Sequence, residues 1–491
     1  MWDVLRLATG AIRQRAVLGQ SAERIAARQR RRLRDLVARA KADSPFYAER
    51  FRDVDPDRFE LAQLPTLTKA EMMANFDRFL TDRRLKRAEI EAFVGDPDRL
   101  GQWYLGRYAP SRTSGTQGMP ALIVQDRRMM ELLFALQMGR GSVFPANPLA
   151  ALQRMVRRAR LAVVTIGRGF YPSAVALAYA PKAARAFVDR LWLTHIEPVD
   201  RVVAQLNRFR PNILLAYANV LEILAREALA GRLSLGRGEP LRQVINMSEP
   251  LSDGAARLVR DAFGLPVTNN YASGECMALC TGCPQGYGMH QQADWAILEI
   301  VDRDNRPVPP GQPGEKVLIT NLYNPLQPFI RYELADVATL SPEPCPCGSP
   351  LPRILKVEGR TDEMVWIRDG DRFRQVHPYV FVDFLDECPA LGWYQIVQEE
   401  RNGFVLRASA APGRQIGLEE LRGLIGRGLQ RFGLADLIRF DVVVSERVAP
   451  DPVSGKLKRI SSRVGAPEGL PVRGGGLLGG PHIDIPLTVG Q

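Results

Sequence analysis

A run of hydroxyl and glycine residues is the sharpest chemical signal in the chain. Residues 111–120 read Ser-Arg-Thr-Ser-Gly-Thr-Gln-Gly-Met-Pro and precede a strand that we expect over residues 121–124. Glycine lets backbone N–H groups crowd around phosphate oxygens, and Ser and Thr hydroxyls donate further hydrogen bonds. The run therefore predicts a phosphate-binding loop, and a plain turn is the alternative. It is not a Walker A loop, because no Lys-Ser or Lys-Thr follows its second glycine.

A basic segment near the C-terminus offers a second group that suits phosphate chemistry. Residues 454–460 read Ser-Gly-Lys-Leu-Lys-Arg-Ile and follow a turn at Pro452. A lysine in this segment could bring positive charge to an α-phosphate and to a carboxylate, where charge builds up during attack. A solvated basic turn is the alternative that the segment by itself leaves open.

Cysteine and histidine residues supply a third kind of chemistry. The six cysteines are few for so long a chain, and all except Cys388 lie in clusters, which is more typical of metal ligands than of disulfides. Three thiolates and one imidazole can close a tetrahedral zinc site. We therefore predict a structural Zn²⁺ site formed by Cys283, His290, Cys345 and Cys347. Cys276 and Cys280 are competing ligands, and burial of the thiols as small apolar groups is the alternative without a metal.

The first part of the chain indicates an α/β domain that could position these groups. A length of 491 residues exceeds what one hydrophobic core usually organises, so we expect two or more domains. Residues 1–95 read as a mainly helical lead-in of short helices and loops. Apolar strand-like runs then alternate with helical segments, at 161–166, 213–215 and 244–246 for strands and 252–263 for a helix. This alternation favours a largely parallel sheet.

The second part of the chain predicts a change of architecture. After residue 290 the pattern is one of strands and turns, with strands expected at 295–301 and 316–320. A smaller α+β unit follows, with strands expected at 393–397, 404–408 and 439–444 and a helix at 418–431. We therefore divide the chain into a large N-terminal domain, residues 1–362, a small C-terminal domain, residues 363–463, and a flexible Gly- and Pro-rich tail, residues 464–491.

The charge of the chain suits an anionic partner. The 66 Lys and Arg residues exceed the 54 Asp and Glu residues, which gives a net charge of +12. Much of the excess lies in the arginines of residues 28–34, where apolar residues recur at helical spacing through Ala40. We favour an amphipathic helix with a solvated basic face over a nucleic-acid arm. A zinc-stabilised nucleic-acid-binding protein remains the rival function from another class.

The N-terminal residues and the hydropathy pattern bear on location. The first twenty residues mix charged and apolar side chains and lack a secretion signal. No uncharged apolar run approaches the roughly 18 residues that a membrane-spanning helix requires. We therefore expect a cytoplasmic protein without a membrane partner.

Five motifs occur in an order that resembles the adenylate-forming superfamily, also called the AMP-dependent synthetases and ligases. They are Thr113–Pro120, the Tyr-Ala-Ser-Gly-Glu of residues 271–275, the Arg-Tyr-Glu-Leu-Ala-Asp of residues 331–336, the Gly-Arg-Thr-Asp of residues 359–362 and the Ser-Gly-Lys of residues 454–456. Further motifs, at residues 248–250, 328–332 and 345–348, are similar to the phenylacetate-CoA ligase branch. The resemblance covers roughly residues 30–463.

This resemblance implies an activity and the ligands that go with it. An enzyme of this kind activates a carboxylic acid with ATP and Mg²⁺ to an acyl-AMP, releases pyrophosphate and then transfers the acyl group to coenzyme A. Transfer to an amine, a hydroxyl or a carrier-protein thiol is the alternative. The resemblance to the branch further implies an aryl acid as the usual substrate and a homodimer as a common assembly. It also supports the zinc site, because some members of the branch carry one in the region of Cys283 to Cys347. The C-terminal domain would then be a mobile lid.

The resemblance also implies roles for single residues. The resemblance assigns phosphate contacts to Thr113, Ser114, Gly115, Thr116 and Gly118. It assigns further nucleotide contacts to Ser248, Glu249, Pro250 and Arg360. Tyr271 would stack on adenine, Glu275 would bind Mg²⁺ and Asp336 would hold the ribose hydroxyls. Lys456 would serve the first half-reaction, and Asp362 would be the hinge of the lid.

Three positions depart from the motifs of the superfamily. Gln117 replaces the second Thr of the phosphate loop, Gly274 replaces a Ser or Thr before the glutamate, and Ala335 replaces a Gly before the aspartate. Gly274 removes a hydroxyl that often supports the metal and the nucleotide. We expect these changes to leave the fold intact and to bear on turnover.

Overall fold

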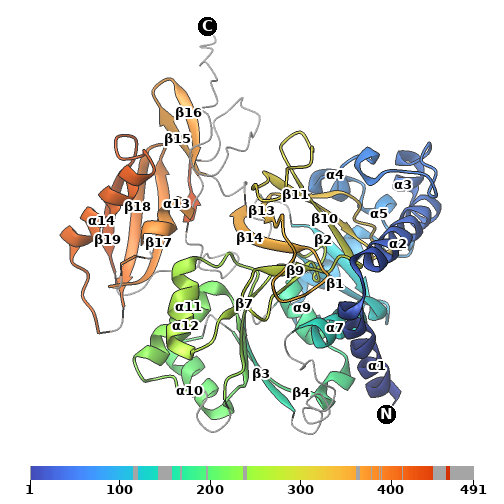
Figure 1. Cartoon of the computed structure of the whole chain (residues 1–491), viewed down its shortest axis with the longest axis horizontal. Coiled ribbons are helices and arrows are strands. Elements are labelled where there is room, and N and C mark those ends of the chain that lie inside the picture. The colour runs from blue at the N-terminus through green and yellow to red at the C-terminus, as the bar shows by residue number, and fades with distance from the viewer. Residues whose placement is uncertain are drawn as a thin grey trace.

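A computed structural model gives the arrangement of most of the chain. It describes residues 2–113, 120–141, 158–165, 169–194, 197–235, 240–360, 365–376, 379–385, 387–388, 390–411, 413–445 and 460–464. The described part combines helices with sheets of both parallel and antiparallel strands (Figure 1). This is the mixed α/β class that the sequence predicts.

The N-terminal residues form helices, as predicted for the lead-in. These helices are α1 (Trp2–Ala16), α2 (Ala22–Asp43), α3 (Pro45–Arg50), α4 (Lys69–Ala74), α5 (Phe76–Phe79) and α6 (Arg87–Gly95). Ser21, Ser44 and Thr68 each accept a backbone hydrogen bond at the start of a helix, the usual role of a Ser or Thr at an N-cap. The apolar face of α2, including Leu36 and Val37, joins the main hydrophobic core.

That core extends under the antiparallel part of the fold. The hairpin of β1 (Tyr108–Arg112) and β2 (Leu122–Asp126) leads into α7 (Arg127–Arg140). A three-stranded sheet in the order β10-β11-β12 comprises Ala296–Val301, Lys316–Asn321 and Tyr332–Leu334. Buried side chains of β2 and β11, such as Ile123 and Ile319, lie in the same core as those of the N-terminal helices.

A five-stranded parallel sheet forms the second layer of the N-terminal part. Its order is β4-β3-β5-β6-β7, with strands Val188–Thr194, Ala159–Thr165, Ile213–Ala216, Gln243–Met247 and Val267–Asn270. One face packs on α10 (Val199–Phe209), α11 (Ala218–Leu229) and α12 (Asp253–Phe263), whose apolar residues recur at helical spacing. The short helix α9 (Pro172–Ala178) follows β3. The parallel strands expected from the sequence are confirmed here.

A four-stranded antiparallel sheet joins residues 280–291 with residues 336–360. Its order is β13-β14-β9-β8, with strands Asp336–Leu340, Arg353–Arg360, Met289–Gln291 and Cys280–Gly282. Residues from two distant stretches of chain therefore lie side by side, since Arg353 is the backbone partner of His290.

The C-terminal residues form a separate core (Figure 1). Its elements are β15 (Val365–Asp369), β16 (Arg372–Val376), α13 (Tyr379–Leu385), β17 (Leu391–Glu400), β18 (Gly403–Ala410), α14 (Leu418–Arg431), β19 (Arg439–Val444) and β20 (Ile460–Ser462). The main sheet runs in the order β19-β18-β17-β20. The predicted boundary at residue 362 and most of the predicted tail lie outside the described residues, so the division into domains stays a prediction.

The basic helix α2 differs in part from its prediction. Asp294 is fully buried and accepts two hydrogen bonds from Arg140, at 2.6 and 2.9 Å. From α2, Arg32 reaches the same carboxylate at 3.2 Å and Arg28 at 3.6 Å. The Arg32 guanidinium also stacks on Trp295, 3.2 Å from the ring centroid. The prediction of a solvated basic face is therefore wrong for these two arginines, because a buried carboxylate far along the chain holds them.

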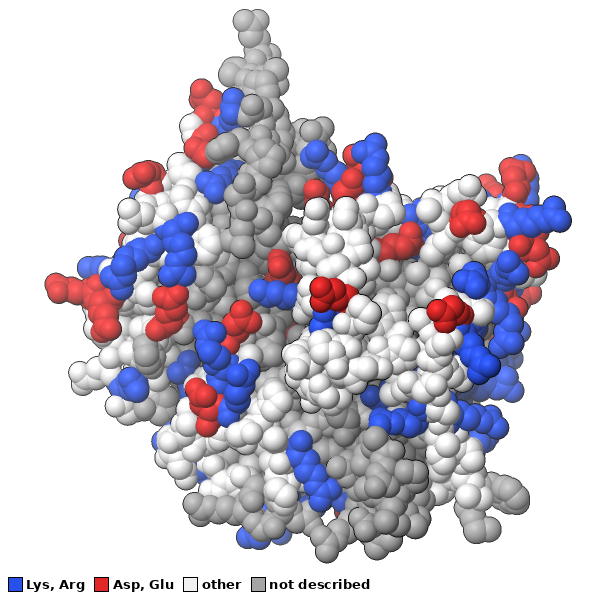
Figure 2. All heavy atoms as spheres, viewed as in Figure 1, with Lys and Arg blue, Asp and Glu red and all other residues white. Residues whose placement is uncertain are grey.

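The charges around Asp294 also affect its protonation. Burial alone would raise the pKa of this carboxyl group, but hydrogen bonds and charges from Arg140, Arg32 and Arg28 hold the pKa below its usual value. Other basic side chains remain at the surface, and Lys and Arg gather on the flank formed by α2 and the helices beside it (Figure 2). Acidic side chains are interspersed among them, as on an ordinary solvated surface.

No helix within the described ranges is long and apolar enough to cross a membrane.

Candidate functional site

The predicted phosphate loop belongs to the segment that connects β1 with β2. Thr113 closes the base of the loop, because its backbone N–H donates to Ala121 O and its hydroxyl accepts from Ala121 N, both at 2.9 Å. Ser114, Gly115, Thr116, Gln117 and Gly118 lie outside the described residues. The hairpin thus fixes where the loop begins and ends, and the contacts of the loop itself stay predictions.

Two further predicted segments follow neighbouring strands of the parallel sheet. Ser248, Glu249 and Pro250 come directly after β6, and Tyr271 comes directly after β7, whose Asn270 is the backbone partner of Met247. Ligands of open parallel sheets bind outside the carboxyl ends of the strands. The two segments are therefore placed at the edge of the sheet where a ligand is expected.

The backbone of this edge is held in a particular shape. Ser248 has a φ of 63°, in the left-handed region that non-glycine residues rarely adopt. The Glu249 carboxylate accepts from Asn219 N at 3.2 Å, at the start of α11, and Glu249 O accepts from the Asn246 side chain at 2.8 Å. Glu249 therefore also has a structural contact, because it satisfies a backbone donor in the first turn of a helix.

The segment of Tyr271 and Glu275 is joined to the segment of Tyr332 and Asp336 by two hydrogen bonds. The Tyr271 hydroxyl donates to Asp336 Oδ2 at 2.6 Å, and the Tyr332 hydroxyl donates to Glu275 Oε1 at 2.9 Å. We call these two contacts the crossed pairs. Tyr271, Tyr332 and Glu275 are buried, and Asp336 is half-buried at the start of β13. The predicted adenine, magnesium and ribose residues therefore share one place in the structure.

Gly274 connects this place with the phosphate loop. A Cβ atom on Gly274 would lie 3.0 Å from Thr113 Cγ2 and 3.2 Å from Pro172 Cγ. Those distances are tighter than ordinary van der Waals contacts, so the glycine lets the two segments approach each other closely. The glycine that stands where the superfamily motif has Ser or Thr therefore has a steric reason in this chain.

Arg331 and Arg360 lie close to Tyr332 and Asp336, Arg331 as the residue before Tyr332 and Arg360 on the strand paired with Asp336. Arg331 is buried, pairs with Glu299 at 3.0 Å and donates to the carbonyl oxygens of Ala62 and Leu64, which makes it a structural residue. Arg360 is the backbone partner of Asp336 across β13 and β14. The predicted nucleotide role of its side chain stays a prediction. Asp362 and Lys456 lie outside the described residues.

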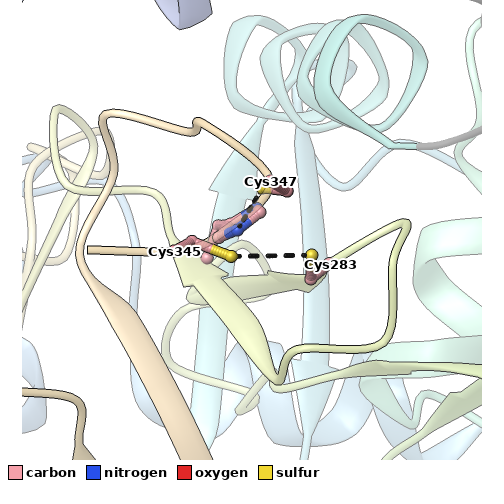
Figure 3. Close-up of side chains that lie close together, drawn as sticks. Cys283, Cys345 and Cys347 are labelled. Carbon is pink, nitrogen blue, oxygen red and sulfur yellow. Dashed lines mark hydrogen bonds between the residues drawn. The ribbon is translucent and has the colours of Figure 1, made fainter. Parts of the chain in front are cut away.

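The four predicted zinc ligands also converge, and Figure 3 shows the three cysteines of the group. Cys283 Sγ lies 3.7 Å from Cys345 Sγ, and Cys347 Sγ lies 3.4 Å from His290 Nε2. All four ligand atoms lie within 4.8 Å of one another. Zn–S bonds of about 2.3 Å and Zn–N bonds of about 2.0 Å place tetrahedral ligand atoms roughly 3.5 to 3.8 Å apart. The two measured pairs lie close to this spacing, and the four ligand atoms form one compact group.

Two turns bring these ligands together. Cys283 N donates to Gly288 O at 2.7 Å in the turn between β8 and β9, and Gly348 N donates to Cys345 O at 3.0 Å in the knuckle after β13. A Cβ atom on Gly288, which has a φ of 93°, would lie 2.5 Å from Ile354 O. Only glycine fits this close approach of the turn to β14.

The environment of the cluster shifts the pKa values of its members in different directions. Burial and the nearby charge of Arg353 lower the pKa of His290, which favours the neutral imidazole that binds metals. Burial alone would raise the pKa of Cys345, but hydrogen bonds, first from the Cys347 backbone, lower it, whereas burial raises the pKa of Cys347 to about 12. Burial likewise raises the pKa of the competing Cys276 to about 12 and that of Cys280 well above its usual value. Both lie in the main hydrophobic core and outside the cluster, as expected for small apolar residues.

Comparison with known proteins adds independent findings. The sequence is 24% identical over 468 residues to a phenylacetate-coenzyme A ligase of Thermus thermophilus, a match that covers 89% of this chain and 96% of that protein. A solved 2-hydroxyisobutyryl-CoA ligase in a postadenylation state has a TM-score of 0.66 and 20% identity, with 91% of this chain and 90% of the other covered. The chain has the adenylate-forming ligase fold.

Further comparisons agree with this conclusion. The same 2-hydroxyisobutyryl-CoA ligase in a thioesterification state, bound to an acyl-AMP and coenzyme A, has a TM-score of 0.53 and 21% identity, with 91% of each chain covered. No family model matches the sequence. The resemblance to the phenylacetate-CoA ligase branch that the motifs predict is confirmed by the similarity to the Thermus thermophilus protein along nearly the whole chain.

Tyr332 is the residue that sequence reasoning missed. It stands in a recognised motif, but the prediction gave it no role of its own. A signal was present, because Tyr332 and Asp336 have the same spacing as Tyr271 and Glu275.

Proposed function

We propose that this protein is an AMP-forming acid–CoA ligase. It activates a carboxylic acid with ATP to an acyl-AMP, releases pyrophosphate and transfers the acyl group to coenzyme A. The observation that carries the proposal is the meeting of Thr113, Tyr271, Glu275 and Asp336 at one edge of the parallel sheet, within the adenylate-forming fold. The full-length similarity to a phenylacetate-coenzyme A ligase supports the choice of acceptor.

The residues of the edge have separable roles in this proposal. Asp336 accepts hydrogen bonds from the vicinal ribose hydroxyls without any change of protonation at neutral pH. The ring of Tyr271 supports the adenine face, and the start of the loop at Thr113 directs backbone N–H groups to the phosphates. Lys456 of the C-terminal part supplies positive charge to the attacking carboxylate and the α-phosphate.

The residues present also fit a magnesium ion. Glu275 offers a hard carboxylate oxygen, and its segment packs against the start of the phosphate loop through Gly274. Bound with ATP, the ion would neutralise phosphate charge at the step in which the nucleotide is attacked.

We propose that Cys283, His290, Cys345 and Cys347 bind a structural Zn²⁺ ion. All four tetrahedral positions would be filled by protein ligands, which leaves no open position for substrate. The ion would join the β8–β9 turn to the knuckle after β13 and so stabilise the approach of the chain to residue 360.

A direct experiment tests the ligase activity. Purified protein with ATP, Mg²⁺ and a panel of carboxylic acids, aryl acids among them, should release pyrophosphate in an acid-dependent way. Lys456→Ala should abolish this release with an unchanged melting temperature. Lys458→Ala is the matched control, because it removes a charge from the same basic segment and should leave the release within a few-fold of wild type. Unchanged release in Lys456→Ala would refute the assigned role of the lysine.

The acceptor needs a separate measurement. Mass spectrometry of the products should show an acyl-CoA when coenzyme A is present and only acyl-AMP when it is absent. An amide or ester formed with other additives, without an acyl-CoA, would favour the amine or hydroxyl acceptor instead. The supply of ATP and coenzyme A in the cytoplasm agrees with a cytoplasmic location for this activity.

A further inference from the structure

The crossed pairs relate two segments of equal spacing. Tyr271 and Glu275 lie four residues apart in one segment, and Tyr332 and Asp336 lie four residues apart in the other. Each tyrosine donates to the acid of the opposite segment, at 2.6 Å for Tyr271 to Asp336 and 2.9 Å for Tyr332 to Glu275. The arrangement is reciprocal, because neither acid is held by the tyrosine of its own segment in these contacts.

The Glu275 side of this arrangement is built on rigid elements. Tyr332 is the first residue of β12, where it is the backbone partner of Ile319 in β11, and its side chain is 2% exposed. Asn321 ends β11, and its side chain donates to the Glu275 backbone carbonyl at 2.7 Å. The sheet therefore holds Glu275 at two points, through Asn321 at the backbone and through Tyr332 at the carboxylate.

The hydrogen bond from Tyr332 occupies one of the two carboxylate oxygens. Within the described part of the chain, it is the one side-chain hydrogen bond to the Glu275 carboxylate. A phenol that donates to Oε1 fixes the rotation of the carboxylate and leaves Oε2 to bind a cation. Partners of this kind, which orient a metal ligand without touching the metal, typically change metal affinity by about 10- to 100-fold.

We propose that Tyr332 is a positioning residue for the metal side of the site and that the Tyr271 hydroxyl is the matching positioning group for the ribose side. Tyr332 acts through Glu275, and the Tyr271 hydroxyl acts through Asp336. Each tyrosine therefore serves the binding function that lies in the opposite segment. This inference rests on the proposed function, since it assigns the metal to Glu275 and the ribose to Asp336.

Two binding measurements separate the two sides without relying on turnover. Mn²⁺ binding in the presence of a non-hydrolysable ATP analogue, followed by the electron paramagnetic resonance signal of the free ion, reports on Glu275. AMP binding without added divalent ion, followed by calorimetry, reports on Asp336. Tyr332→Phe should weaken Mn²⁺ binding about tenfold and leave AMP binding within about twofold. Tyr271→Phe keeps the ring and should weaken AMP binding more than Mn²⁺ binding.

A matched control measures how much stability is lost when any buried, hydrogen-bonded tyrosine hydroxyl is removed. Tyr47 is also buried, and its hydroxyl donates to Pro328 O at 2.7 Å, in the same loop that leads to Tyr332. Tyr47→Phe should lower the melting temperature by an amount similar to Tyr332→Phe and leave Mn²⁺ binding unchanged. Equal loss of Mn²⁺ binding in both variants would overturn the proposal, because the effect would then be structural.

A double-mutant cycle tests whether Tyr332 acts through Glu275. In a Glu275→Gln background, Tyr332→Phe should cause no further loss of Mn²⁺ binding. A full additional loss would overturn the proposal. Should Tyr332→Phe fail to fold, Asn321→Ser removes the other contact to Glu275 and should weaken Mn²⁺ binding with AMP binding retained; unchanged Mn²⁺ binding in that variant would count against the assignment.

The experiment distinguishes this inference from the proposed function. If the wild-type protein shows no acid-dependent pyrophosphate release, the proposed function fails. If the wild-type protein is active and Tyr332→Phe leaves Mn²⁺ binding unchanged, the proposed function stands and only the positioning role fails.

Discussion

Two clusters of polar side chains connect the same two stretches of chain, residues 271–290 and residues 332–347, by different means. The crossed pairs use single hydrogen bonds between side chains, and each acid keeps a second oxygen that is not part of the pair. The Cys/His cluster gathers four ligand atoms within 4.8 Å of one another, at the proposed zinc site. Hydrogen-bonded acids can still receive a ligand, whereas a closed set of four ligands can only hold its ion.

This difference predicts which measurement each cluster controls. Substitutions in the crossed pairs should lower ligand binding or activity while the fold remains. Substitutions in the Cys/His cluster should lower stability first. The predictions below test this separation, from the largest expected effect to the smallest.

Cys345→Ser should have the largest effect, on stability. Loss of one of four ligands leaves the others without their shared ion, and we expect the free energy of unfolding to fall by about 4 kcal/mol or more. Elemental analysis should show about one zinc per chain in wild type and none in the variant, and thermal denaturation should show the loss of stability. The control is Cys388→Ser, a buried cysteine of the C-terminal core, which should retain zinc. Full zinc content in Cys345→Ser would contradict the site.

Asp294→Asn tests an anchor that contains neither metal nor ligand. It leaves the buried guanidinium of Arg140 without its carboxylate, so we expect a loss of about 3 kcal/mol at pH 7. The folded-state pKa of Asp294 is lowered, so its stabilisation is fully present above the unfolded pKa, whose ordinary value is 3.8, and is lost as pH falls through the folded pKa.

The difference in unfolding free energy between wild type and Asp294→Asn should therefore be constant near neutral pH and shrink below about pH 4. Urea denaturation at a series of pH values measures it. Asp189→Asn, which removes an exposed ion pair with Arg158, serves as control and should change little. A difference that grows as pH falls would contradict the assignment.

Glu275→Gln should affect activity more than stability. It keeps the size of the side chain and removes the charge that we propose binds Mg²⁺, so pyrophosphate release should fall about 100-fold, equivalent to roughly 2.7 kcal/mol. Rates at saturating Mg²⁺ and the melting temperature should be compared with those of Glu333→Gln, a half-buried glutamate beside Tyr332. A large drop in melting temperature with little change in rate would break the separation of the two clusters.

Gly274→Ser should have the smallest effect. The new Cβ atom would press on Thr113 Cγ2, and we expect a cost of about 1 kcal/mol, seen as a few-fold higher KM for ATP. Thr113→Ser removes that methyl group and keeps the hydroxyl that accepts from Ala121, so the double variant should recover much of the loss. Failure of this rescue would mean that the glycine serves another purpose. Gly95→Ser, at an open position, is the control.

The sequence predicted local elements more accurately than contacts between distant segments. The helix at residues 418–431 and the strand at residues 439–444 are confirmed at their predicted bounds, because periodicity and chain breaks are local signals. The convergence of Cys283, His290, Cys345 and Cys347 was also predicted, since clustered cysteines with a nearby histidine are more typical of metal ligands than of disulfides. The contact of Arg32 with Asp294 was missed, because an arginine run looks the same whether its partner is water or a buried carboxylate.

The candidate site shows the same limit. The motifs indicated Tyr271, Glu275 and Asp336, but which tyrosine holds which acid depends on the pairing of β11 with β12 and on the turn after β7. That information lies in sheet register, which no single segment of sequence contains. The steric reason for Gly274 could not be predicted from the sequence either, because Pro172 and Thr113 approach this glycine from other parts of the chain.

The reciprocal geometry restricts where the chain can change length during evolution. A loop between residues 276 and 331 can change length without altering the spacing of Tyr271 and Glu275 or that of Tyr332 and Asp336. Such loops can therefore lengthen. A one-residue change between Tyr271 and Glu275, or between Tyr332 and Asp336, would break both contacts at once. Homologous chains that keep this chemistry should therefore preserve the two spacings of four together, and a change of one tyrosine should coincide with a change in the opposite acid.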